Sequence, residues 1–272
     1  MVRLLVTSAA GLGIVAAVAV PGLGGAASPA GGLLAFTRSS GDGPVVHVMR
    51  ADGSGVRRLA RGAEPAWAPD GRRIVFSRAA QLRSSLWIVG LDGRAARRLT
   101  RGGDADWEPS WSPDGRTIAF EAWTSRGSAI AVVPARGGAR RLLTDPRKDD
   151  HMPAFSPDGR WIAFTRGGNA GADIHVMRAD GTGERRVRRH AGEDLDPAWS
   201  PDGRSIAFGS GRGGRYSLYV MRADGTRLRR LRTPGGTPAW SPDGRSIAYA
   251  TGRDGDPEIH VMSVSGAADR RL

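Results

Sequence analysis

The chain of 272 residues has no cysteine, one lysine (Lys148) and one asparagine (Asn169). Without cysteine it can form no disulfide bond, no thiolate metal site and no lipid-modified cysteine of the lipoprotein type. Its stability must therefore come from packing. Of its 40 basic residues, 39 are arginine, so the net charge of +13 reflects biased composition as much as selection for an anionic partner.

Long apolar runs are absent except at the N-terminus, where MVRLLVTSAAGLGIVAAVAV carries a single basic residue, Arg3. This pattern predicts a secretory signal peptide over residues 1–19, and hence an exported protein of the periplasm, cell envelope or extracellular space. Cleavage is expected after Ala19, although a second small-residue pattern ends at Ala27. The alternative is an uncleaved segment that anchors the chain in the membrane, because the run approaches the shortest bilayer-spanning length.

Short catalytic motifs are also missing. The chain contains no G-x-S-x-G nucleophile elbow, no H-E-x-x-H zinc motif and no phosphate-binding P-loop. We therefore predict no catalytic residue, no metal ligand and no cofactor from local motifs.

What the chain does contain is a twelve-residue motif, PAWSPDGRSIAF at residues 197–208, which recurs at nearly constant intervals. Near copies begin at Pro65, Pro109, Pro153 and Pro238, and a decayed copy, SPAGGLLAF, covers residues 28–36. The turn aspartates of the five intact copies are spaced by 44, 44, 44 and 41 residues, at Asp70, Asp114, Asp158, Asp202 and Asp243. Self-similarity at this period indicates six stacked units, the first of them degenerate.

Each copy predicts a hairpin followed by two more strands. Ser-Pro-Asp-Gly suits a tight turn in which the aspartate binds neighbouring backbone amides, so we assign the five turn aspartates a structural role. An I-A-F run, a third run such as DIHVMRADG and a short fourth run that begins with Arg-Arg complete the unit. Four strands repeated six times predict an all-β fold, namely a six-bladed β-propeller of four-stranded antiparallel blades with a degenerate first blade.

The propeller is expected over residues 20–272, as a single domain. Approximate blade limits are 20–61, 62–101, 102–145, 146–190, 191–233 and 234–272. Because the sequence ends with the outer strand of the sixth blade, we expect the inner strand of the first blade between Val20 and Ala27.

The P-x-W-S-P-D-G-R-x-I-A-F core resembles the WD-type repeat of TolB-like β-propellers, over nearly all of the chain that follows the N-terminal run. The resemblance implies a six-bladed ring. TolB itself has an α/β domain before its propeller, and similar propellers precede the hydrolase domain of prolyl-oligopeptidase-type peptidases. We expect neither domain in this chain.

An Arg-Arg pair lies in the fourth run of every repeat. In a propeller this strand is the exposed outer edge, where charge opposes edge-to-edge association, and we expect a monomer. An arginine-rich surface is also suited to anionic envelope polymers. Nucleic acid is not expected as a partner, because an exported protein rarely meets it and no nucleic-acid-reading motif is visible.

Equivalent residues of the inner strands should form rings around the central channel. Three acids precede the repeat proline, and three more lie two residues before that position in their repeats; together with one histidine they predict an acidic channel mouth. These residues are Glu64, Glu108, Asp196, Asp106, Asp150, Asp194 and His151. The structural alternative is that the acids only solvate loops and cap turns.

We therefore expect a non-catalytic scaffold of the cell envelope that binds a protein or peptide partner through the acidic mouth. The alternative is a metal-dependent, lactonase-like hydrolase, in which channel carboxylates hold a divalent cation such as calcium. Asparagine is often among such ligands, and its single occurrence weighs against this alternative.

Overall fold

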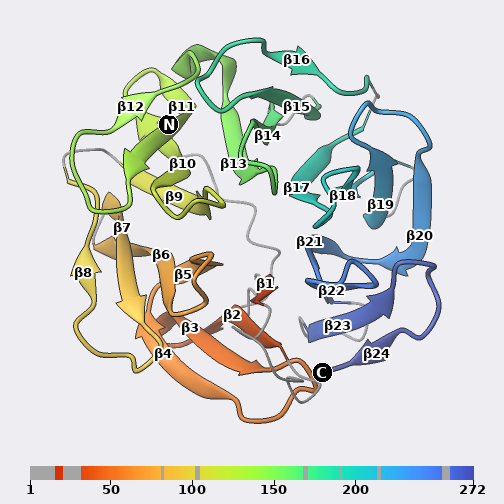
Figure 1. Ribbon diagram of the computed structural model, residues 1–272, viewed down its shortest axis with the longest axis horizontal. Coiled ribbons are helices and arrows are strands. Elements are labelled where there is room, and N and C mark those ends of the chain that lie inside the picture. Colours follow the sequence, from red (N-terminus) through yellow and green to blue (C-terminus); the bar gives the residue numbers. More distant parts are fainter. Residues whose placement is uncertain are drawn as a thin grey trace.

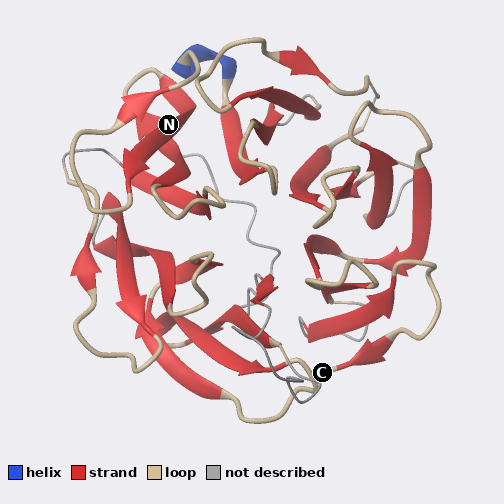
Figure 2. Ribbon diagram, in the orientation of Figure 1, coloured by secondary structure: helices blue, strands red, loops and turns tan. Residues whose placement is uncertain are grey.

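The computed structural model describes residues 16–20, 32–80, 83–101, 105–167, 171–189, 192–212, 216–252 and 258–272. Six four-stranded antiparallel sheets form the blades of a ring around a central channel (Figure 1). Figure 2 shows that strands dominate; within the described ranges the one helix is a 3-10 turn, η1 (Pro146–Lys148). No helix of these ranges is long and apolar enough to span a membrane. The predicted six-bladed β-propeller is confirmed.

In every blade the strands follow one another in sequence from the channel to the rim. The innermost strands are β1 (Ala16–Val20), β5 (Ala63–Trp67), β9 (Ala105–Trp111), β13 (Asp150–Phe155), β17 (Asp194–Trp199) and β21 (Gly236–Trp240). The second strands are β2 (Leu33–Ser40), β6 (Arg73–Ala80), β10 (Thr117–Thr124), β14 (Trp161–Arg166), β18 (Ser205–Ser210) and β22 (Ser246–Thr251).

The third strands are β3 (Gly43–Arg50), β7 (Arg83–Gly90), β11 (Gly127–Pro134), β15 (Asp173–Arg178), β19 (Ser217–Arg222) and β23 (Glu258–Ser263). The outer strands are β4 (Arg57–Arg61), β8 (Arg97–Arg98), β12 (Arg141–Leu142), β16 (Arg185–Arg186), β20 (Arg229–Pro234) and β24 (Arg270–Arg271). Each blade is thus one continuous stretch of chain. The ring closes by packing of the first blade against the sixth, where Leu272 joins a cluster that includes Phe36.

The innermost strand of the first blade differs from our expectation. It lies at Ala16–Val20, upstream of the expected stretch 20–27, and residues 21–31 are outside the described part of the chain. The run Ala-Ala-Val-Ala-Val suits a strand better than the glycine-rich residues that follow it. Cleavage after Ala19 would remove most of β1, so the expected signal peptide and a four-stranded first blade require the same residues. The cleavage position stays a prediction.

The apolar core consists of six clusters, one between each pair of neighbouring blades. The aromatic residue at the third position of the repeat motif, for example Trp199 and Trp240, takes part in these interfaces. The indole N–H of Trp199 donates to the carbonyl of Ala154 in the preceding blade at 3.1 Å, and that of Trp240 donates to Ala198 at 3.1 Å. Trp199 and Trp240 therefore hold adjacent blades together through both their apolar faces and their N–H groups, whereas the indole N–H groups of Trp67 and Trp111 have no hydrogen-bond partner among the described residues.

A Pro-Asp-Gly turn closes each of the five intact hairpins, preceded by serine in four of them and by Ala68 in the second blade. In the fifth blade, Asp202 Oδ1 accepts hydrogen bonds from the Arg204 N–H at 3.0 Å and the Ser200 hydroxyl at 2.6 Å. Gly203 has φ +68°, a conformation that a side chain disfavours. The bond from the backbone N–H two residues on recurs at Asp70, Asp114, Asp158 and Asp243.

The outer arginine pairs do more than present charge. Arg97 reaches the next blade, where its Nη2 donates to the Ala135 carbonyl at 2.7 Å, while Arg98 donates to Ser85 Oγ of its own blade at 2.7 Å. The same division of roles occurs at Arg229 with Arg230 and at Arg270 with Arg271. Part of the arginine content is thus explained by contacts that brace the blades.

Candidate functional site

The inner strands carry a bulge at the residue before the repeat proline. In five blades this residue has a positive φ, between 49° and 56°, although none is glycine: Glu64, Glu108, Met152, Asp196 and Thr237. The pairing of the inner strand with the second strand shifts at the same place. Such backbone costs on the order of 1–3 kcal/mol per residue and persists only where surrounding contacts enforce it.

The bulged residues bond across the blade boundaries. The N–H of Glu64 donates to Thr37 Oγ1 at 3.0 Å, and the N–H of Glu108 donates to Glu64 Oε2 at 2.8 Å. The carboxylate of Asp196 likewise accepts from the N–H of Thr237. Side chains at this level of the channel therefore link one blade to the next.

A cavity of about 570 Å³ follows the channel along the inner strands. Glu64, Glu108 and Asp196 line the end at which these strands begin, and Trp67 and Trp111 line the part nearer the repeat turns. The prolines of the repeat motif complete the wall: Pro65, Pro109, Pro113, Pro153, Pro157, Pro197, Pro201, Pro238 and Pro242. This volume lies in the range of sites that bind small ligands.

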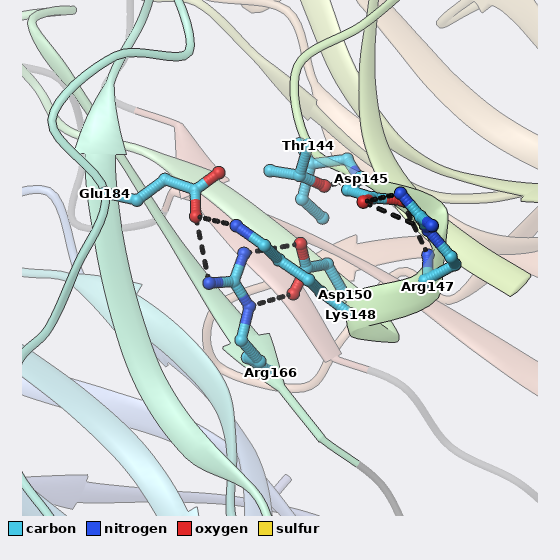
Figure 3. A network of polar contacts seen from close by, with 8 residues as sticks. Thr144, Asp145, Arg147, Lys148, Asp150, Arg166 and Glu184 are labelled. Atoms are coloured by element: carbon cyan, nitrogen blue, oxygen red, sulfur yellow. Dashed lines mark hydrogen bonds and ion pairs between the residues drawn. The ribbon is translucent and has the colours of Figure 1, made fainter.

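Asp106, Asp150 and Asp194, which lie two residues before the bulge position of their strands, are buried inside the blades. Asp150 has no exposed surface, and Arg166 binds both its oxygens, at 2.6 and 2.8 Å (Figure 3). Arg166 also donates to Glu184 at 2.9 Å, and Lys148 donates to the same carboxylate at 2.9 Å. Asp150 thus belongs to a four-residue charge network.

The other two aspartates have arginine partners as well. Asp106 is paired with Arg140 at 2.9 Å, and Asp194 is paired with Arg212 and accepts from Ser210 at 2.6 Å. We therefore correct the prediction that these three aspartates face the mouth. Residues two apart share a face of a regular strand, but the bulge adds one residue and reverses the alternation.

Glu121 of β10 is an acid whose role we did not expect. It is 6% exposed, accepts from the indole N–H of Trp123 and is hydrogen-bonded to Glu108. The other repeats have a small or hydroxyl residue after the aromatic that ends the motif, namely Thr37, Ser77, Thr165, Gly209 and Ala250. A carboxylate inside the otherwise apolar run TIAFEAW is the signal that could have identified it.

His151 connects this acid to a second one. Its Nδ1 lies 3.0 Å from Glu121 Oε1, and its Nε2 lies 3.2 Å from Asp149 Oδ1. Burial lowers the pKa of His151, but the hydrogen bond and charge of Glu121 and the charge of Asp149 outweigh it, so the pKa is raised. The imidazole is therefore stabilised in its charged form between the two carboxylates.

Glu64, Glu108 and Asp196, here called the ring acids, hold protons more strongly than ordinary carboxyl groups. Burial raises the pKa of Glu64 to about 7 and that of Asp196 to about 6. Burial, followed by the charges of Glu121 and Glu64, raises the pKa of Glu108 well above its usual value. Near neutral pH the mouth is thus a mixture of carboxyl and carboxylate groups.

In the described part of the chain, Glu64, Glu108 and Asp196 form no ion pair with an arginine or lysine. No group of three or more His, Asp or Glu side chains in these ranges is arranged to hold a metal ion. What remains is a proton-bearing acidic ring at the end of an apolar channel. It can accept hydrogen bonds from a ligand and compensate a positive charge.

The family model described as the TolB beta propeller domain matches residues 13–152 and 107–237. No curated protein sequence matches the chain. TolB from Acinetobacter baumannii is 22% identical with a TM-score of 0.74 over 84% of this chain, which spans 59% of that protein.

Two enzymes also share the fold. An oligogalacturonate lyase from Vibrio parahaemolyticus is 12% identical, with a TM-score of 0.62 over 97% of this chain and 85% of that one. A puromycin-hydrolyzing peptidase of Mycobacterium tuberculosis is 17% identical, with a TM-score of 0.64 over 90% of this chain and 44% of that one. These likenesses concern fold alone, whereas the family model covers more than half of the sequence. The chain belongs to the TolB β-propeller family.

Proposed function

We propose that the protein is an exported, non-catalytic binding module of the cell envelope, which holds a protein or peptide partner at the acidic mouth of its channel. The observation that carries this proposal is the ring of Glu64, Glu108 and Asp196, which lines one end of a cavity whose described lining residues include no arginine or lysine. Membership of the TolB propeller family supports a binding role, and the N-terminal apolar run supports export.

A purely structural role would not require carboxylates here. Glu64 accepts the N–H of the next blade's bulge, but Thr37 performs the same task for Glu64 with a neutral hydroxyl. A hydroxyl is easier to bury than a carboxyl group, because it has no charged form to desolvate. The acids are therefore better explained by a ligand than by blade packing.

The test is capture of partners from envelope extracts by the tagged protein. Replacing the ring acids in a triple variant, Glu64→Gln, Glu108→Gln and Asp196→Asn, keeps their shape and removes their charge. We expect it to capture the partner at least about tenfold less well, the effect of losing roughly 1.4 kcal/mol.

A matched control removes three exposed carboxylates away from the channel, with Asp42→Asn, Asp52→Asn and Asp180→Asn. It makes the same change from acid to amide at three positions, removes at least as much negative charge, and should capture the partner normally. Undiminished capture by the ring variant, with an unchanged circular dichroism spectrum, would reject the mouth and direct attention to the arginine-rich rim.

The second candidate is a metal-dependent hydrolase, and the cluster of Glu108, Glu121 and His151 is the observation in its favour, since acid and base groups lie in hydrogen-bond contact there. Metal analysis of the purified protein separates the two functions. Stoichiometric calcium, bound by the wild type and lost in Glu108→Gln, would favour the enzyme.

A further inference from the structure

Glu108 is the centre of a group of four carboxyl groups. The charges of Glu121 from β10, Glu64 from β5 and Asp196 from β17 all act on it. From the remaining described channel side chains, β13 contributes Met152, and His151 of the same strand is bonded to Glu121 rather than to Glu108. β21 contributes Thr237, a neutral group.

At the bulge position of the inner strands, two polar atoms are buried with no hydrogen-bond partner in the described residues, namely Glu108 Oε2 and Thr237 Oγ1. Buried polar atoms are nearly always satisfied, and an orphan in a folded protein calls for an explanation. Both atoms belong to cavity-lining residues. A ligand with N–H donors would satisfy them, and a positive charge on it would offset the four carboxyl groups.

Most of the rest of the cavity wall is apolar. Beyond the ring acids it is made mainly of the motif prolines and aromatic side chains such as Trp67, Trp111 and Trp240, with Ser110 and Ser200 as polar exceptions. An apolar wall gains nothing from a hydrated metal ion, but it gains from an apolar group that leaves water. Proline and indole faces also attract the stem of an alkylammonium or guanidinium group.

We infer that the channel binds an organic cation, a primary ammonium or guanidinium group on an apolar stem, in exchange for a proton. The cation's N–H groups donate to the carboxylates of Glu108, Glu64 and Asp196, while its stem lies along the prolines and tryptophans. The proton that a ring carboxyl group gives up passes to the solvent. This inference rests on the proposed function and identifies the chemical group by which the partner is held.

Calorimetric titration of the full-length protein with 4-phenylbutylamine tests the inference. The amine stays charged between pH 5 and 8 because alkylamines have a pKa near 10. The affinity should rise by about tenfold per pH unit from pH 5 to 7 for each proton released. At pH 7, buffers of different ionisation enthalpy should report the release of up to about one proton per cation bound, whereas a pH-independent affinity would overturn the inference.

Two ligand controls separate the alternatives. The neutral isostere 4-phenylbutanol should bind at least about tenfold more weakly, the loss of one charge-assisted hydrogen bond. Equal binding of the alcohol would show that only the apolar wall matters. Calcium chloride alone should not compete with the amine; competition would mean that the ring holds metal and would overturn the organic-cation assignment.

The variant Glu108→Gln should reduce proton release and make the pH profile shallower, since Glu64 and Asp196 remain, whereas Asp180→Asn on the outside of a blade should leave both unchanged. The wild-type pH profile does not depend on the variant's folding, so the inference stays falsifiable if Glu108→Gln is unstable. An envelope partner that binds at the mouth while no amine does would sustain the proposed function and reject this inference. Loss of both would reject both.

Discussion

The inner strands carry two sets of acids at positions two residues apart, with one of each on β9 and β17, and the two sets are neutralised in opposite ways. Asp106, Asp150 and Asp194 are fully buried, and each is held by an arginine. The ring acids, by contrast, line the cavity and retain protons because burial raises the pKa of each, to about 6 for Asp196 and about 7 for Glu64.

The difference is instructive because arginine is abundant in this chain. Pairing with arginine occurs at the inner strands and at the outer rim, so a cationic partner for the ring acids was chemically within reach. Stability alone would favour such pairing over buried protonated acids. The unpaired ring acids therefore make the fold less stable than arginine-paired acids would, which is typical of binding sites.

The largest effect is expected from breaking a paired aspartate. Asp194 and Arg212 have side chains that are 2% and 8% exposed. Replacing Asp194→Asn leaves the guanidinium buried without a counter-charge and should lower the free energy of unfolding by about 3 kcal/mol. Urea denaturation at pH 7 measures this change.

A second variant combines Arg212→Met with Asp194→Leu. Replacing a buried pair by apolar groups is often nearly neutral, so the double variant should be more stable than Asp194→Asn alone. An unchanged urea midpoint for Asp194→Asn would mean that the paired acids contribute nothing and that the contrast between the two sets fails.

An effect of opposite sign is expected from a ring acid. The pKa of Glu64 is about 7 in the folded protein against an ordinary value of 4.5, so the unfolded chain releases this proton first as pH rises. The wild type therefore loses stability between pH 4.5 and 7 on account of this group. Glu64→Gln removes that loss and should be more stable than the wild type by about 2 kcal/mol at pH 8, with no difference at pH 4.

Denaturation at both pH values checks this expectation. The neutral side chain can still accept the N–H of Glu108, so blade packing is preserved. A variant that is less stable than the wild type at pH 8 would show that the carboxylate stabilises the ring, and the contrast with Asp194 would disappear.

The fold could be predicted from the sequence because the motifs that specify each blade are short and recur along the chain. A turn motif that returns five times sets the number of blades, and Arg-Arg after the third run marks each outer strand. The first blade was harder, since its inner strand precedes the decayed motif and no repeat marks its position. Only a comparison of strand preference, AAVAV against the glycine-rich residues after it, would have favoured Ala16–Val20.

Only part of the candidate site could be predicted from the sequence. The ring position of Glu64, Glu108 and Asp196 follows from equivalence between repeats, and these residues do line the cavity. The bulge beside them is a backbone feature, and without it all six acids would share one face of their strands. The contact of His151 with Glu121 joins two blades, and pairing at that range leaves no trace in a local motif.

The smallest effect is expected from a third kind of acid, the turn aspartate, which is exposed and bonded to its own hairpin. The hydrogen bond from Ser200 and that from the Arg204 N–H lower the pKa of Asp202. Asp202→Ala should therefore cost about 1 kcal/mol at pH 7, and the ring should fold normally. The decayed first motif already carries Ala30 at this place.

A carboxyl group with a lowered pKa stabilises the fold only while it is ionised. The stability difference between Asp202→Ala and the wild type should therefore shrink as the pH falls below about 4, whereas for Glu64→Gln it grows as the pH rises. Thermal unfolding at pH 7 and pH 3 decides the matter: failure of Asp202→Ala to fold would mean that this aspartate binds a ligand on which the blade depends.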